Sequence, residues 1–275
     1  MAGSWYAGTE TSLRKQIEDC FLHNIGVKRI PKVNWKGTRK IIGLVCPHAG
    51  YAYSGPIAAN SYGALAEDGA PEVAVILGPN HTGMGSGLSI MADGKWRTPL
   101  GEIEIDSTIA HRIADQSNII DIDEKAHISE HSIEMQVPFL QYLYGQSIKI
   151  VPICMMMQDL DSSRDVGKVL ASSLEGKNAI IIASTDLSHY EPYQRAFDKD
   201  SKAIGEILRL DEEGLMRTIT QLNISMCGPG PVASCIIASK SLGAYKATLL
   251  KYSTSGDISG EMGAVVGYAS ITIEK

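Results

Sequence analysis

Three histidines follow short apolar stretches of the chain, and their positions indicate a shared site. They are His48 after residues 41–45, His81 after residues 73–77, and His189 after residues 179–183. Apolar runs this short and this rich in β-branched residues predict buried strands of an α/β sheet. In open α/β sheets, ligands bind just beyond the carboxyl ends of the strands. We therefore expect the three histidines to form one polar site along one edge of the sheet.

Cys227 is the cysteine best placed to join two of these histidines. It begins the sequence CGPGP, which is expected to open a helix, and the N-terminus of a helix lowers the pKa of a thiol. Together His48, His81 and Cys227 would offer two imidazole nitrogens and one thiolate, a set that suits non-haem Fe(II), Zn²⁺ or copper. Spacing alone leaves a second interpretation open, in which two hydrogen-bonded loop histidines have no link to a buried free cysteine.

Asp186 and His189 form a D-x-x-H pair after the third apolar stretch. In one interpretation Asp186 orients the imidazole of His189, which acts as a general acid or base because its pKa lies near neutrality. In the other, Asp186 caps the helix that follows and His189 is a surface residue. The residues alone fit both interpretations.

A third polar cluster consists of Glu130, His131 and Glu134. On an expected helix, Glu130 and His131 would each share a face with Glu134. Their functional role would be to support a metal ligand or to hold a substrate. The simpler interpretation is a solvated helix start whose acids complement the helix dipole. We favour that for Glu130 and leave both open for His131 and Glu134. Of the other candidates, Cys46 and Cys235 are assigned to the core and His23, His111 and His127 to the surface.

The elements that must position these residues alternate along the chain. Helices are expected from Thr9 or Thr11 to Gly26, at 56–67, from 106 or 107, from 129, and at 161–174, 197–208, 212–222 and 232–242. Further strands are expected at 102–105, 147–153, 247–252 and 264–271. This alternation predicts one doubly wound α/β domain over residues 1–275, with a central mixed sheet and helices on both faces.

Composition excludes several classes of function. The formal net charge is −6, which argues against a protein that binds nucleic acid through its phosphate backbone. The five cysteines are odd in number and scattered, so a reducing cytoplasm fits better than a disulfide framework. The first residues have no signal-peptide pattern, and no apolar run is long enough to span a membrane. Small molecules and proteins remain as the expected partners.

Seven segments occur in the order in which they occur in one known family: AGSWYAG, PHAGYAYSG, LGPNHTG, RTPLG, EHSIEMQVPFLQ, STDLSHY and CGPGP. Over residues 3–271 the chain resembles the Memo family. The fold of that family is similar to the catalytic subunit of class III extradiol dioxygenases. The resemblance therefore implies a single three-layer α/β domain with a pocket at the strand ends.

The resemblance also implies roles for particular residues. His48, His81 and Cys227 match the metal-binding trio, and His189, with Asp186 beside it, matches the catalytic base of the dioxygenases. The dioxygenases have a carboxylate where this chain has Cys227. The thiolate of a cysteine donates more charge than a carboxylate and can itself be oxidised. Relatives are associated with iron or copper, so we expect Fe(II) or copper, with Zn²⁺ as a further candidate.

Three functions follow as hypotheses. The first is a metal-dependent redox or dioxygenase-like enzyme acting on a small substrate. The second is a binding protein that holds an anionic peptide or small molecule beside the histidines and Arg97. The third, a metallohydrolase, depends on His131 and Glu134. Microbial relatives often accompany radical-SAM and AMMECR-type proteins, which the resemblance suggests as pathway partners.

Overall fold

The structure is a computed structural model that describes all 275 residues. The helices are α1 (Glu10–Leu22), α2 (Gly55–Asp68), α3 (Ser107–Gln116), α4 (Val137–Tyr144), α5 (Leu160–Leu174), α6 (Tyr193–Leu208), α7 (Glu212–Leu222), α8 (Pro229–Ser241) and the short α9 (Ser255–Ser259), with 3₁₀ turns at η1 (Lys125–His127) and η2 (Glu134–Gln136). The strands are β1 (Ile41–Cys46), β2 (Val73–Pro79), β3 (Leu88–Ile90), β4 (Lys95–Thr98), β5 (Gly101–Glu104), β6 (Asp121–Ile122), β7 (Lys149–Met155), β8 (Ala179–Ser184), β9 (His189–Glu191), β10 (Lys246–Thr254) and β11 (Val265–Glu274).

Four parallel strands form the centre of the sheet. The strand order is β10-β11-β1-β8-β2-β7-β3-β6, with β9 paired to β11. β1, β8, β2 and β7 are parallel neighbours, whereas β11 runs antiparallel to β1 and β3 antiparallel to β7. Every residue of β1, β2 and β8 is buried, as expected for strands covered on both faces. The sheet is therefore mixed, as predicted.

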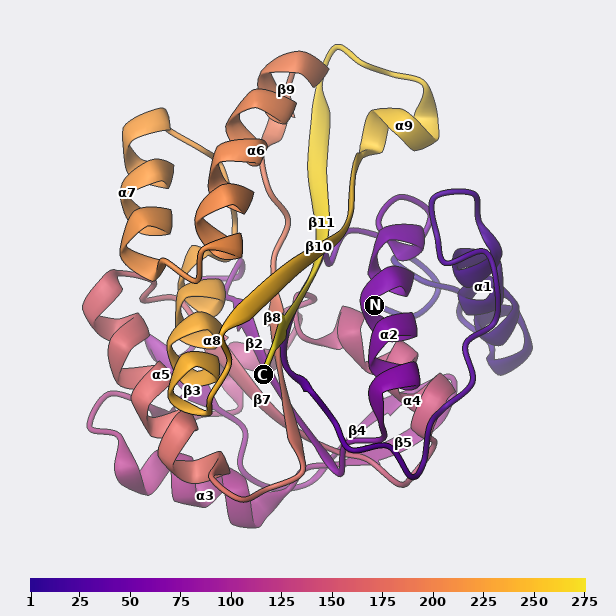
Figure 1. Cartoon of the computed structure of the whole chain (residues 1–275). Helices are drawn as coiled ribbons and strands as arrows, with labels where there is room; N and C mark the ends of the chain where they lie inside the picture. The colour runs from indigo at the N-terminus through magenta and orange to yellow at the C-terminus, as the bar shows by residue number, and fades with distance from the viewer.

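Helices cover both faces of this sheet (Figure 1). α2 packs on one face together with α1 and α4, and α8 packs on the other face together with α5, which α3 and α7 flank. A single hydrophobic core cluster of 69 buried residues joins the layers. The chain is thus the three-layer α/β domain that the sequence predicts. No helix combines the length and the apolar character that crossing a membrane requires.

The register brings the strand exits to one level. Cys46 pairs with Ser184, and Leu77 pairs with Ala183. Because the three strands are parallel, the segments that follow β1, β2 and β8 all leave at the same edge of the sheet. That edge is where the site residues are expected.

Several boundaries differ from the sequence prediction. The helix expected from Ser129 begins only at Val137, after the turn η2, because the side chain of Glu130 accepts the backbone N–H groups of His131 and Ser132 and bends the segment around itself. Asp159, rather than Asp161, caps α5 through the N–H of Ser162. α1 ends at Leu22 instead of continuing to Gly26, and of the two predicted caps, Thr9 and Thr11, it is Thr9 that caps the helix.

A glycine lets the two helices behind the site approach closely. A Cβ atom at Gly167 in α5 would lie 2.7 Å from the Cβ and Cγ2 atoms of Ile237 in α8. That distance is shorter than a normal carbon–carbon contact of about 3.5–4.0 Å, so a side chain here would force the helices apart. α8 begins at Pro229, two residues after Cys227, so this helix pair lies directly behind that cysteine.

We expect Gly167→Ala to destabilise the protein by about 1–3 kcal/mol, the usual cost of overpacking a rigid contact. Gly205→Ala in α6 is a matched control, since the nearest atom to its new Cβ would be the end of Arg209 at 3.7 Å. The control is expected to be neutral or more stable by up to about 1 kcal/mol. Urea unfolding measures both; a Gly167→Ala midpoint equal to wild type would contradict the close packing of α5 on α8.

Candidate metal centre

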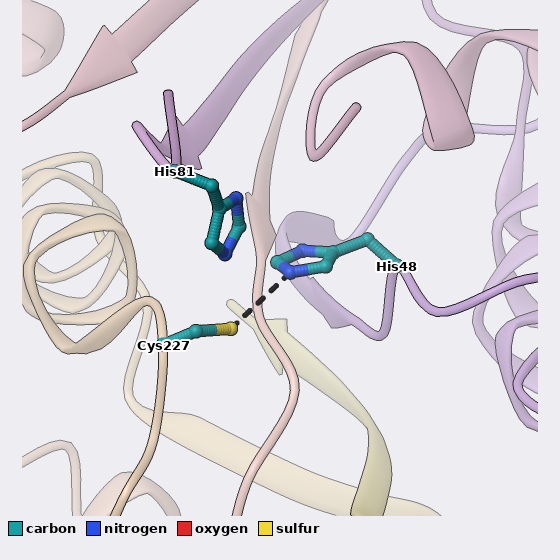
Figure 2. Close-up of side chains that lie close together, drawn as sticks. All are labelled: His48, His81 and Cys227. Carbon is teal, nitrogen blue, oxygen red and sulfur yellow. Dashed lines mark hydrogen bonds between the residues drawn. The ribbon is translucent and has the colours of Figure 1, made fainter. Parts of the chain in front are cut away.

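His48, His81 and Cys227 meet at the carboxyl edge of the sheet. One ligand atom from each lies within 4.8 Å of the other two. The His48 Nε2 atom is 3.2 Å from the Cys227 Sγ atom. Figure 2 shows the two rings and the thiol pointing toward one another from three separate segments. The structure therefore brings together the three residues that the sequence selected as metal ligands.

Backbone contacts hold Cys227 at this edge, although it is far away in sequence. The N–H of Asp186 donates to Cys227 Sγ at 3.1 Å, and the N–H of Cys227 donates to the carbonyl of Asp186 at 3.3 Å. The side chain of Gln158, beyond the end of β7, donates to the Cys227 carbonyl. The exits of β7 and β8 therefore position the segment that opens α8.

The hydrogen bonds around His48 determine which ring nitrogen faces the site. The hydroxyl of Ser184 donates to the carbonyl of Ser132 at 2.6 Å and accepts from the amide of Gln136 at 2.7 Å. Its single proton is thus used, so the His48 Nδ1 atom, 2.9 Å away, must be the donor. The Nε2 atom keeps its lone pair. Burial, together with the nearby imidazoles, lowers the pKa of His48 well below its usual value, so the ring is neutral.

Glu130 orients the ring of His81 through Nδ1, as Ser184 orients the ring of His48. Its carboxylate lies 2.9 Å from His81 Nδ1 and also accepts the backbone N–H groups of His81, His131 and Ser132. Burial alone would raise the pKa of Glu130, but these hydrogen bonds outweigh it and lower that pKa to about 2. A permanent carboxylate on Nδ1 leaves Nε2 of His81 free toward the site.

The interpretation of Glu130 as a solvated residue at a helix start is therefore wrong. Its side chain is only 1% exposed, and it supports a candidate metal ligand. Glu130 and His131 form a second possible metal-binding group with His81. However, donors already surround the carboxylate, so it fits a supporting role better than that of a ligand.

His131 lies between two aromatic neighbours. Its ring stacks on Trp5 at a centroid distance of 4.2 Å and on His81 at 4.5 Å. Burial, followed by the effect of His81, lowers the pKa of His131 to about 4. The neutral ring therefore forms part of the wall of the site, which agrees with the supporting role left open for it.

Glu134 has a different task. Its Oε1 atom accepts the phenol of Tyr6 at 2.6 Å and lies 3.0 Å from the amino group of Met1. It anchors the N-terminal segment that carries Trp5. Glu134 consequently reaches the site only through that segment.

The pKa of the Cys227 thiol differs from the sequence expectation. Burial and the nearby Asp186 carboxylate raise the pKa of this thiol, although it precedes a helix. Burial therefore outweighs the helix dipole, because removing a thiolate from water costs more than the helix end returns. A cation that binds Cys227 must displace its proton.

The spacing of the three ligand atoms fits a small transition-metal ion. Nitrogen and sulfur ligands on one tetrahedral ion, at about 2.0–2.1 Å and 2.3 Å, lie about 3.3–3.6 Å apart. The observed 3.2 Å and the limit of 4.8 Å bracket that separation, so small side-chain rotations suffice. A four-coordinate ion held by these three residues would keep one position open, which is typical of catalytic rather than structural sites.

Asp186 and His189 do not form the expected pair. The buried Asp186 carboxylate accepts the backbone N–H of His48 at 2.8 Å, and the segment leads into β9 and not into a helix that Asp186 could cap. His189 Nδ1 instead lies 2.8 Å from the carbonyl of Ser225. A carbonyl can only accept, so Nδ1 of His189 carries a proton and Nε2 is the ring nitrogen left for other contacts.

Two other residues are placed differently from the sequence expectation. Arg97 on β4 has a side chain that is 80% exposed and pairs with Glu102 of the same hairpin, so it is not part of the group around the histidines. His127 is largely buried beside Trp96 and not a surface residue. Burial lowers the pKa of His127 to about 4. The assignments of Cys46 and Cys235 to the core are confirmed.

Known proteins are similar to this chain in sequence or in fold. Residues 1–272 match the family described as Memo-like protein. A MEMO1 family protein of Methanopyrus kandleri is 50% identical, covering 100% of this chain and 98% of its own length. One of Methanothermobacter thermautotrophicus is 48% identical, covering 99% of this chain and 98% of its own length. An uncharacterized protein from Escherichia coli K12, 14% identical in sequence, has the same fold with a TM-score of 0.57, over 84% of this chain and 99% of its own. The chain belongs to the Memo-like protein family.

Proposed function

We propose that this protein binds iron or copper through His48, His81 and Cys227 and catalyses an oxidation–reduction reaction on a small substrate. The observation that carries the proposal is the convergence of two imidazoles and a thiol, with the Nδ1 atom of each imidazole bonded to a partner away from the site. Such a preset tautomer lowers the cost of assembling the ligands around an ion. When bound, the metal would supply electron transfer and an open position for a substrate or oxidant.

The choice between a redox metal and Zn²⁺ depends on the ligand set. A thiolate is soft and donates more charge than the carboxylate of a two-histidine, one-carboxylate site, so it favours copper and stabilises oxidised iron. The His81 side chain is 35% exposed, which leaves the site accessible from one side. A structural Zn²⁺ site would instead be closed by a fourth protein ligand.

His189 would act as the base. Its Nε2 lone pair is preset by the Nδ1–H bond to the Ser225 carbonyl, and the ring is close enough to influence the pKa of both His48 and Asp186. A substrate hydroxyl placed between the metal ligands and His189 would lose its proton to Nε2. The reaction is then an oxidation of a deprotonated, electron-rich small molecule, with dioxygen as the electron acceptor.

The two competing functions have less support. An anion-binding pocket would need a cation at the site, but Arg97 pairs with Glu102 on an exposed hairpin. A metallohydrolase would need Glu134 to activate water, but that carboxylate is occupied by Tyr6 and Met1. A redox enzyme therefore remains the function that the geometry favours.

Metal content tests the ligand assignment. Untagged wild type is loaded with Fe(II) or Cu(I) and desalted, and we expect it to retain about one ion per chain. The triple variant His48→Ala, His81→Ala, Cys227→Ala should retain about a tenth of that or less, because no ligand remains. The single variant His111→Ala, whose ring pairs with Asp93 at the surface, is the control. Equal metal in wild type and the triple variant would refute the site.

Glu130→Gln tests the support of His81. Replacing the carboxylate by an amide keeps the volume but weakens the hold on Nδ1–H, so metal affinity should fall by about 10–100-fold. Chelator competition measures this, with the exposed Glu124→Gln as the control, which should match wild type. An unchanged affinity in Glu130→Gln would show that His81 does not depend on this carboxylate.

His189→Ala separates a base from a ligand. Turnover, followed as oxygen consumption with a panel of catechols and other phenols, should fall by about 10²–10⁴-fold while metal content stays at the wild-type level. A loss of metal from this variant would make His189 a ligand instead. If the metal-loaded wild type consumes no oxygen with any of these compounds, the redox proposal gives way to the binding alternative.

A further inference from the structure

Tyr268 on β11 lies level with one of the candidate metal ligands. β11 runs antiparallel to β1, with Ile271 opposite Val45. The same register, continued past the end of β1, puts Tyr268 at the level of His48. Tyr268 therefore reaches the metal centre from the antiparallel side of the sheet, a side from which none of the residues discussed above comes.

The segment after β8 also runs alongside Tyr268. The N–H of Leu187 donates to the carbonyl of Gly267 at 2.8 Å, and the N–H of Gly267 donates to the carbonyl of Ser188 at 2.9 Å. These two bonds make Asp186 the cross-strand neighbour of Tyr268. Burial, together with the carboxylate of Asp186, raises the pKa of the Tyr268 phenol, so the phenol keeps its proton and can donate it to a hydrogen bond.

The hydroxyl of Tyr268 has no partner in the chain. Only 2% of the residue is exposed, yet no group of the chain bonds to its phenol. Two other buried tyrosines do have partners, because Tyr51 donates to a backbone carbonyl and Tyr62 to a glutamine side chain. The unpartnered hydroxyl of Tyr144 is sealed in the interior, whereas that of Tyr268 is not. Since a buried hydroxyl without a partner costs free energy, the phenol of Tyr268 is suited to a hydrogen bond with a ligand.

The general base of the proposed reaction lies close to this phenol. His189 pairs with Val266, which is two residues from Tyr268 and therefore on the same face of β11. Side chains at such diagonal positions of an antiparallel pair are within reach of each other. One oxygen atom of a ligand can thus contact both His189 and Tyr268.

Two exposed tyrosine rings lie at the same edge. Tyr53 and Tyr190 are 46% and 80% exposed, and both are near enough to Tyr268 to raise its pKa. The backbone of Tyr190 has a φ of 57°, a left-handed conformation that is strained for an aromatic residue and that proteins retain mainly at functional sites. A flat aromatic body could pack against these rings.

We propose that Tyr268 donates a hydrogen bond to the substrate oxygen that loses its proton to His189, and that the substrate is a hydroxyaromatic compound whose ring packs on Tyr53 and Tyr190. This inference rests on the proposed function and adds a residue to it. The O–H bond of the substrate breaks, its proton passes to Nε2 of His189, and the negative charge stays on the substrate oxygen. A hydrogen bond to a charged oxygen is stronger than one to a neutral oxygen, so Tyr268 favours the ionised substrate.

Binding of 4-nitrophenol to the Zn²⁺-loaded protein tests the proposal without turnover, because zinc has no redox chemistry. The absorption of 4-nitrophenol changes when it ionises, so a titration reports the bound anion directly. Tyr268→Phe removes only the hydroxyl and should weaken binding of the anion by about 10–100-fold. The methyl ether 4-nitroanisole has no proton to lose and should bind wild type and Tyr268→Phe alike.

Tyr144→Phe is the matched control. It also removes a buried hydroxyl without a partner, but Tyr144 lies beside Arg39 at the other edge of the sheet. This control should bind 4-nitrophenol as wild type does. Both variants should melt at or above the temperature of wild type, because neither hydroxyl has a bond to lose. A Tm of Tyr268→Phe well below that of Tyr144→Phe would assign the hydroxyl to folding and overturn the proposal.

Three binding results would also overturn it: equal affinity of wild type and Tyr268→Phe for 4-nitrophenol, equal losses for 4-nitrophenol and 4-nitroanisole, or no binding to wild type at millimolar concentration. The metal content separates these results from a failure of the proposed function. If wild type retains no ion, the proposed function fails, and the same two proteins titrated without metal still decide whether Tyr268 binds the anion.

Discussion

Burying the carboxylate of Glu130 costs free energy that only well-placed donors offset, and the segment around it is shaped to supply them. The N–H groups of His131 and Ser132 come from its own chain, and the N–H and Nδ1–H of His81 come from the exit of β2. Removing one donor would leave a buried charge partly unpaired. The same hydrogen bonds that stabilise the carboxylate of Glu130 also fix the ring of His81. At Glu130, stability and site geometry therefore depend on the same contacts.

His48 is held in a similar way, but by neutral groups. Ser184 has its proton committed to Ser132, so it can only accept from His48. Both imidazoles thus turn Nε2 toward one small volume, and burial keeps His48 uncharged. Cys227 is the exception, because its thiol is held in its protonated state by burial. Loading an ion would therefore exchange the thiol proton of Cys227 for the metal.

The general architecture was predictable because its causes are local. Short β-branched runs indicated β1, β2 and β8. Parallel strands bring their exits to one edge, so His48 and His81 could be chosen from the sequence. Cys227 could be chosen as a candidate, but its protonation depends on burial by segments far away in the chain. Glu130 was misjudged for a related reason: its local spacing resembles a helix start, whereas its partner His81 is 49 residues away in sequence. Only the two N–H bonds to His131 and Ser132 were local enough to have given a signal.

The coordination of a bound ion is the most direct test of this site. X-ray absorption spectroscopy of the Zn²⁺-loaded protein, with zinc used as a probe of the ligands, should show one sulfur at about 2.3 Å and two imidazole nitrogens at about 2.0–2.1 Å. The sulfur shell should vanish in Cys227→Ser while the imidazole pattern persists. A spectrum with oxygen and nitrogen neighbours alone in the wild type, or a sulfur shell that survives Cys227→Ser, would contradict the assignment of His48, His81 and Cys227 as the metal ligands.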